Sequence, residues 1–136
     1  MMKKIIMTLT VAFGIVVIGS AFVQGDAKQS IARGKEVYGI YCQNCHMEDG
    51  KGMPDLNPPL AQADFMKKPA KSLIDVVLKG SVASLTVNGK KYNGAMPAQD
   101  YLSDEQIADV LNFAKNTWGN KIPGTITPAM VKAQRK

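Results

Sequence analysis

The distribution of apolar residues divides the chain near position 25. Residues 5–23 form an uncharged, mostly apolar run that follows two lysines and ends among small residues. This arrangement is typical of a secretory signal peptide. Because 19 uncharged residues are also close to the minimum for a bilayer span, an uncleaved membrane anchor is the alternative. In both cases we expect residues 1–25 to direct export of the rest of the chain.

The spacing of apolar residues after position 25 predicts two helices in the first half of the chain. The first has Ser30 as its N-cap and runs to about Cys45. Gly34 interrupts it, either as a tolerated surface glycine or as a point where another backbone comes close. The second helix is expected from Ser72, as N-cap, to Lys79.

The segments around the second helix predict loops and a hairpin. Residues 47–69 are rich in glycine and proline, with one helical turn near residues 61–66. Loops of this length in compact domains usually have a function of their own. Further on, residues 85–87 and 91–92 flank Asn88-Gly89, which is the strongest short signal for a β-hairpin.

The clearest helix follows Ser103, which forms a capping-box pattern with Gln106. Its apolar stripe extends to Trp118, and Gly119 is expected to end it. A last short helix is expected at Thr127-Pro128, where a capping residue precedes proline. The whole pattern predicts an all-α, loop-rich domain.

Length and charge limit the number of domains and the kinds of partner. The 136 residues leave room for one domain, which we place at residues 26–120, followed by a C-terminal tail of residues 121–136. The formal charge of +6 falls to +4 without residues 1–25, because these contain two lysines and no acid. A basic surface steers a protein toward acidic partners. Nucleic acid is a poor candidate, since the lysines are dispersed and the chain is exported.

The only two cysteines and the only histidine of the chain share one pentapeptide, Cys42-Gln43-Asn44-Cys45-His46. This C-x-x-C-H spacing is that of c-type haem attachment. Two cysteines three positions apart on a helix point the same way, so both thiols can form thioethers with one haem. The histidine that follows can then bind the iron as proximal ligand. The motif predicts one covalent haem c, held by Cys42 and Cys45, with His46 on the metal.

Three other interpretations of the pentapeptide are less favoured. A disulfide between Cys42 and Cys45 is permitted in an oxidising compartment. A thiol–disulfide oxidoreductase would use the same cysteines, but its motif should follow a buried strand and open a helix, whereas Cys42 follows a helical stretch. A structural zinc site lacks a fourth soft ligand.

The second axial ligand of the iron cannot be histidine, because His46 is the only one. A methionine thioether is the usual ligand where the task is electron transfer. Met96 is the best candidate, since small residues precede it and Pro97 restricts its loop, and Met66 is the second. Six-coordinate iron leaves no open site for a substrate, so we expect an electron carrier and not an enzyme. Peroxidase-like activity, the alternative, would require Met96 to be absent from the iron.

These motifs give the chain a resemblance to the class I c-type cytochromes that covers nearly all of residues 30–119. The resemblance implies the all-α class I cytochrome c fold, with helices packed around one covalent haem and a short hairpin before the distal methionine loop. It also implies that Gly34 and Tyr38 of the first helix pack against Val110 and Phe113 of the last long one.

The same resemblance adds residues to the expected haem site. Pro58, or Pro59 in the other register, is similar to the proline whose carbonyl accepts the NH of the proximal imidazole. Leu60 and Tyr92 are placed in the haem pocket. The expected cofactor-binding set is therefore Cys42, Cys45, His46, Pro58, Leu60, Tyr92 and Met96, with His46 and Met96 as metal ligands.

Residues 86–97, residues 102–107 and Trp118-Gly119-Asn120 resemble a bacterial subgroup of this family. Its members are free periplasmic cytochromes, or cytochrome subunits and domains of alcohol, aldehyde and sulfite dehydrogenases and of copper nitrite reductases. This implies a periplasmic carrier of single electrons between redox enzymes and a terminal oxidase or reductase. The alternative is a cytochrome subunit of a larger periplasmic or membrane-associated enzyme, held by residues 5–23 or by protein contacts.

Seven lysines could form a basic rim around the exposed haem edge and dock acidic surfaces of redox partner proteins. Ordinary solvated surface is the alternative for charges dispersed in this way. The seven are Lys51, Lys67, Lys68, Lys71, Lys79, Lys90 and Lys91.

Overall fold

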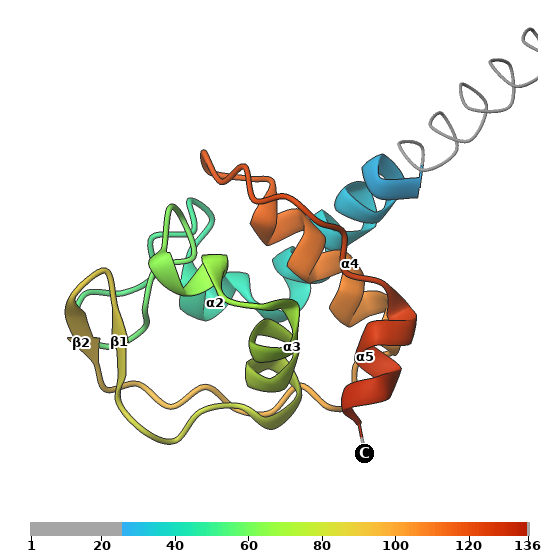
Figure 1. Ribbon diagram of the computed structural model, residues 1–136. Coiled ribbons are helices and arrows are strands. Elements are labelled where there is room, and N and C mark those ends of the chain that lie inside the picture. The colour runs from blue at the N-terminus through green and yellow to red at the C-terminus, as the bar shows by residue number, and fades with distance from the viewer. Residues whose placement is uncertain (1–25, 136) are drawn as a thin grey trace, which may run out of the picture.

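The structure, a computed structural model, describes residues 26–135. The expected signal or anchor at residues 1–25 lies outside the described residues. Figure 1 shows α3 and α4 in the middle of the domain, with the hairpin on one side and α5 on the other. The elements are a helix over residues 26–41, α2 (Gln43–His46), a 3-10 turn (Asp64–Lys67), α3 (Ala70–Lys79), β1 (Leu85–Val87), β2 (Lys90–Tyr92), α4 (Asp104–Lys115) and α5 (Pro128–Gln134). The predicted all-α class is confirmed.

The N-terminal helix, residues 26–41, crosses α4 at very short range. A Cβ placed on Gly34 would lie 2.0 Å from the carbonyl oxygen of Asp109 and 2.8 Å from Cβ of Phe113. Gly34 is therefore the point of backbone approach, and not a tolerated surface glycine. One turn further on, the Tyr38 ring lies 5.4 Å from the Phe113 ring and 4.9 Å from that of Trp118, measured between centroids.

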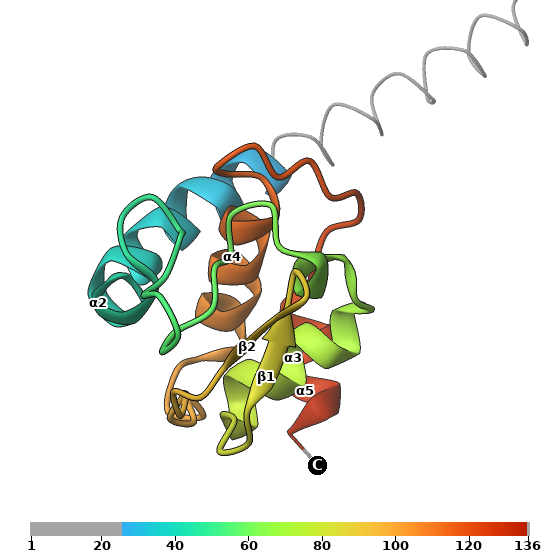
Figure 2. The ribbon, with the colours of Figure 1, turned by 90° about the vertical axis from the view of Figure 1, so that its left-hand side faces the viewer.

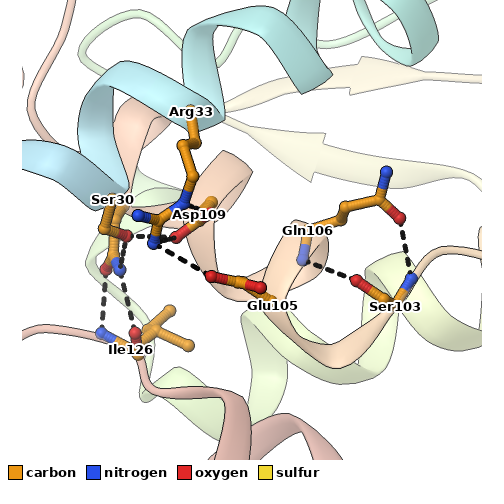
Figure 3. A network of polar contacts seen from close by, with 8 residues as sticks. Ser30, Arg33, Ser103, Glu105, Gln106, Asp109 and Ile126 are labelled. Atoms are coloured by element: carbon orange, nitrogen blue, oxygen red, sulfur yellow. Dashed lines mark hydrogen bonds and ion pairs between the residues drawn. The ribbon is translucent and has the colours of Figure 1, made fainter.

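Ser30 does not cap the first helix, because the backbone is already helical on both sides of it. Its hydroxyl instead donates to Oδ1 of Asp109 at 2.6 Å, and Arg33 donates through Nε to Oδ2 of the same carboxylate at 2.6 Å (Figure 3). Asn112 donates to the Ser30 hydroxyl and exchanges two hydrogen bonds of 2.8 Å with the main chain of Ile126. The hydroxyl of Ser30 is thus used for tertiary contact, which the local sequence does not reveal.

The ends of α3 and α4 follow the sequence signals only in part. Ser72 is not the cap of α3, which begins two residues earlier at Ala70 with Pro69 as N-cap. At α4 the predicted capping box is confirmed: Gln106 N donates to Ser103 Oγ at 3.1 Å, and Ser103 N donates to Gln106 Oε1 at 2.9 Å. The helix ends at Lys115, earlier than predicted, and Trp118 turns out of it with φ of 54°.

The hairpin forms where Asn88-Gly89 predicts it. β1 and β2 pair antiparallel, with Leu85 opposite Tyr92. Both turn residues have positive φ, 51° at Asn88 and 74° at Gly89, as a tight turn between twisted strands requires. Figure 2 views the molecule from the hairpin side, where the two strands lie in front of α3.

The C-terminal residues pack into the domain core. Thr127 caps α5, accepting from the backbone NH of Met130 at 3.4 Å, as the Thr127-Pro128 pair predicts. Val131 is fully buried and Ile126 nearly so. The division into a domain of residues 26–120 and a tail of residues 121–136 stays a prediction. Among residues 26–135, no helix is long and apolar enough to cross a bilayer.

Candidate haem site

Two adjoining pockets lie between α2 and the loop that carries Met96. One is walled by apolar side chains of α3 and α4, and the other opens beside the hairpin. We call the two pockets together the slot, because they share the four residues Cys42, His46, Pro58 and Met96. All seven residues expected to bind the cofactor line this slot, with Leu60 on the apolar side and Cys45 and Tyr92 on the hairpin side.

The pentapeptide lies at the end of the helical backbone, with Cys42 as the N-cap of α2. The NH of His46 donates to the carbonyl of Cys42 at 3.0 Å, so one helical turn separates the first cysteine from the histidine. Cys42 is half-buried and Cys45 is exposed. The two thiols therefore lie at the inner and the outer edge of the same wall.

The imidazole of His46 is buried, and its Nδ1 lies 3.0 Å from the carbonyl oxygen of Pro58. A carbonyl can only accept, so Nδ1 carries the hydrogen and Nε2 of the neutral ring has a free lone pair. Burial lowers the pKa of His46, although the bond to Pro58 acts in the opposite direction. Burial therefore favours the neutral imidazole and the bond to Pro58 orients it, and a neutral, oriented ring is the form that binds a metal. Of the two registers open in the sequence, the contact uses Pro58 and not Pro59.

Gly52 allows the Pro58 carbonyl to reach His46. Its φ is 68°, and a Cβ placed there would lie 2.3 Å from the carbonyl oxygen of Asn57 and 2.6 Å from that of Pro58. The NH of Gly52 donates to the His46 carbonyl at 3.0 Å, which closes the loop. A residue with a side chain at this position would push the acceptor away from the imidazole.

Met96 is held by its main chain, on the hairpin side of the slot. Its NH and carbonyl form a pair of 2.9 Å hydrogen bonds with Ser81, just after α3. Three residues later in the loop, the NH of Gln99 donates to the Val77 carbonyl at 2.8 Å. Sequence reasoning missed Ser81 and Gln99, because neither carries a recognisable motif and their bonds to Met96 and Val77 use backbone atoms.

The two methionines proposed from the sequence occupy different places. Met96 lines both pockets of the slot together with His46, whereas Met66 lines only the apolar pocket and is 2% exposed. Met66 is therefore placed as a wall residue among core side chains, and Met96 as a residue at the centre of the slot.

The alternatives to haem attachment fit this site poorly. Burial, with a smaller contribution from Cys45, raises the pKa of the Cys42 thiol to about 11. A redox-active pair needs a cysteine whose pKa is lowered, so the site disfavours thiol–disulfide exchange. In the described part of the chain, no group of three or more histidine, cysteine or acidic side chains could hold a metal ion by itself.

The sequence profile of the cytochrome c family matches residues 31–118, which include the pentapeptide, Pro58 and Met96. The chain belongs to the cytochrome c family. It is therefore an electron-transfer protein whose cofactor is a covalent haem c, and the expected fold class is the one observed. The slot fits this group chemically, since it combines apolar walls, two thiols, a neutral imidazole and a thioether.

This cytochrome c is 36% identical over 126 residues to cytochrome c-552 of Thermus thermophilus, with 77% of this chain and 95% of that protein covered. It is 38% identical over 104 residues to the cytochrome c subunit of alcohol dehydrogenase (quinone) of Gluconobacter oxydans, covering 75% of this chain and 22% of that subunit. The gluconate 2-dehydrogenase cytochrome c subunit of Pantoea cypripedii is 36% identical over 122 residues, covering 88% of this chain and 27% of the subunit. The chain thus spans about a quarter of the length of these dehydrogenase subunits.

Proposed function

We propose that this cytochrome c is a periplasmic carrier of single electrons between redox enzymes and a terminal oxidase or reductase. Cys42 and Cys45 would hold the haem by thioether bonds, and His46 and Met96 would bind its iron. The observation that supports this most directly is the Nδ1–Pro58 contact, because it leaves Nε2 of His46 as the ligand atom. Haem c supplies the one-electron change between iron(II) and iron(III).

The protein's own residues would do three things for this function. Pro58 fixes the plane of the His46 ring and the position of its proton, which makes the imidazole a stronger donor. The thioether of Met96 is a soft ligand that favours the reduced metal. Leu60 and the apolar side chains of α3 and α4 exclude water from one side of the slot, while Tyr92 lines the hairpin side.

The ligand assignment can be tested by visible spectroscopy of the matured, full-length protein. We expect Met96→Ala to lose the weak thioether-to-iron band near the red end of the spectrum. Met66→Ala is the matched control, because it removes the other candidate and should keep the band while lowering stability. Loss of the band in Met66→Ala alone would assign the ligand to Met66 instead.

Docking of redox partners is proposed at the mouth of the slot, where the exposed Tyr41 meets the exposed Tyr101 edge to face, at 5.9 Å between ring centroids. The basic rim is weaker than the sequence suggests, since four of its seven lysines have carboxylate partners at 2.8–3.1 Å. These pairs are Lys51 with Asp49, Lys71 and Lys79 with Asp75, and Lys90 with Asp55. We therefore expect acidic partner surfaces to contribute a shallow salt dependence. A steep fall of the electron-transfer rate with ionic strength would favour the full rim.

A second candidate function is that of a cytochrome subunit within a larger dehydrogenase or reductase. The identity of 36–38% with cytochrome subunits of two dehydrogenases supports it. Residues 5–23 would then serve as a membrane tether. Mass spectrometry of the native protein distinguishes the two, since a free carrier should lack residues 1–25 and carry the mass of one haem. Retention of these residues, with co-purifying subunits, would favour the second function.

A further inference from the structure

The side chain of Arg135 connects the end of α5 to the segment that follows Met96. Its Nη1 donates to the carbonyl of Asp100 at 2.7 Å, its Nη2 donates to the carbonyl of Leu102, and its Nε pairs with the Asp104 carboxylate at 2.5 Å. Figure 1 shows the same arrangement in the backbone: the stretch leading from the hairpin reaches the base of α4 beside the C-terminal end of α5.

The segment from Met96 to Leu102 is held at three places. Ser81 pairs with the main chain of Met96, and the Val77 carbonyl accepts from Gln99, whose amide also donates to the Pro97 carbonyl at 3.1 Å. These two anchors use main-chain atoms of α3 and its end. The third anchor depends on one side chain, that of Arg135. At the far end of the segment Leu102 is buried, and its NH donates to the Gln99 carbonyl at 3.1 Å. Arg135 adds the side-chain contacts to the carbonyls of Asp100 and Leu102.

Arg135 can act as a fixed point because α5 is itself firmly held. Val131 is fully buried against the core, and Gln134 accepts from Nζ of Lys71 at 2.8 Å. The guanidinium holds its NH groups in a rigid fork, so it can reach two carbonyls and a carboxylate at once. Arg135 also lies beyond residues 31–118, the part that matches the family profile. The anchor is thus a feature of this chain outside that matched region.

We propose that Arg135 is a positioning residue for the thioether of Met96. By holding the carbonyls of Asp100 and Leu102, it restricts the loop that aims Met96 into the slot. This inference rests on the proposed role of Met96 as a metal ligand. Without Arg135 the carbonyls of Asp100 and Leu102 lose their charged partner, so the loop moves more freely and Met96 yields its place more readily to a competing ligand.

The test is a titration of the full-length, haem-loaded protein with imidazole, following the loss of the thioether band. We expect Arg135→Ala to bind imidazole about tenfold more tightly than the wild type, because three charge-assisted contacts are lost. Arg135→Lys should lie between the two, since lysine can replace only part of the fork. Lys132→Ala, on the same helix, should behave as the wild type.

A second control separates positioning from a general loss of stability. Val131→Ala leaves a cavity under α5 but removes no hydrogen bond to Asp100 or Leu102, so it should lower the thermal midpoint with little effect on imidazole binding. An unchanged affinity of Arg135→Ala for imidazole would overturn the proposal. So would imidazole affinities of Arg135→Ala and Val131→Ala that change in proportion to their thermal midpoints. A wild-type spectrum without a thioether band, or one that survives Met96→Ala, would overturn the ligand assignment and this inference with it.

Discussion

The two halves of the domain are stabilised in different ways. The helical frame consists of residues 26–41, α4 and α5, and is packed through side chains that are almost fully buried, such as Ile107 and Val131. The loop half consists of residues 47–69 and 80–102. It is held mainly by main-chain bonds between its own loops, including Leu60 N to Gly50 O at 2.7 Å and Gly94 N to Leu56 O at 2.8 Å.

The backbone of the loop half is also less regular. Met47, Asp55, Gln62 and Asn88 all have positive φ there, although none is a glycine. Such conformations persist only where the surroundings enforce them. The frame is therefore held by packed side chains of long helices, whereas the loop half places the Pro58 carbonyl and Met96. Substitutions in the frame should therefore change the free energy of unfolding most, and those in the loop half should also change the properties of the site.

The largest effect is expected for Gly34→Ala in the frame. The new Cβ would lie 2.0 Å from the Asp109 carbonyl oxygen, so the two helices must move apart, at a cost of about 3 kcal/mol in the free energy of unfolding. Gly39→Ala on the same helix is the control, because its Cβ would meet only a Gln43 side-chain oxygen at 3.8 Å. Gly39→Ala should raise the free energy of unfolding by up to about 1 kcal/mol. If denaturant titrations gave the same change in the free energy of unfolding for both variants, the close crossing of the two helices at Gly34 would be refuted.

The next effect is expected for Asp109→Asn, also in the frame. Asparagine would remove the negative charge that accepts from Arg33 and Ser30, and its NH2 group would face one of these two donors. We expect the free energy of unfolding, measured by chemical denaturation, to fall by about 2 kcal/mol. Glu105→Gln is the matched control, since Glu105 also contacts Arg33, at 3.3 Å, but its side chain is 62% exposed. Its effect should stay within about 0.5 kcal/mol. A larger loss for the control than for Asp109→Asn would contradict the buried network.

In the loop half, Gly52→Ala should cost about 1.5 kcal/mol, from strain at φ of 68° and contact with the Pro58 carbonyl. It should also shift the reduction potential, because the bond from His46 to Pro58 is disturbed. Gly89→Ala has a similar φ of 74° but nothing within 4 Å of the new Cβ. We expect it to lose about 1 kcal/mol with no change of potential by redox titration. A shift of potential in both variants would mean that strain alone, and not the Pro58 contact, is responsible.

The smallest effect is expected for Asp75→Asn on the solvent side of α3. Hydrogen bonds from Lys71 and then from Lys79 hold the pKa of the Asp75 carboxyl below its ordinary value of 3.8. Because the folded state lowers this pKa, the contribution of the ion pairs is present above the ordinary value and is lost as the pH falls through the depressed one. Thermal midpoints at several pH values should show a slight difference from the wild type near neutrality, none in strong acid, and less at high salt. A difference between the two thermal midpoints that grows in acid would contradict the lowered pKa of Asp75.

The sequence predicts those features of the fold that depend on neighbours in the chain. Asn88-Gly89, the Ser103–Gln106 box and Thr127-Pro128 each place a turn or helix start correctly, because the residues that form the contact are at most three positions apart. Ser30 and Ser72 were wrongly predicted as caps, since a serine near a helix start carries the same local signal whether it caps or not. The partner of Ser30 lies 79 positions away in the sequence.

The same difference between local and distant contacts decides which residues of the candidate site the sequence predicts. Cys42, Cys45 and His46 are found from one pentapeptide, and Met96 from the composition of its loop. The Pro58 contact was expected only from the family resemblance, because its bond to His46 spans 12 positions of irregular chain. Ser81, Gln99 and Arg135 were not predicted at all, because their contacts with the loop of Met96 depend on how α3 and α5 pack.

The pair of bonds between Asn112 and Ile126 has a consequence for the amide itself. Because the Asn112 amide both donates and accepts, it pairs with the main chain of Ile126 as a backbone peptide group pairs with a neighbouring strand. As a helix, α4 offers no such strand edge of its own. An aspartate of the same size could accept but not donate. The position is therefore sensitive to the smallest chemical change open to an asparagine, the loss of its amide nitrogen.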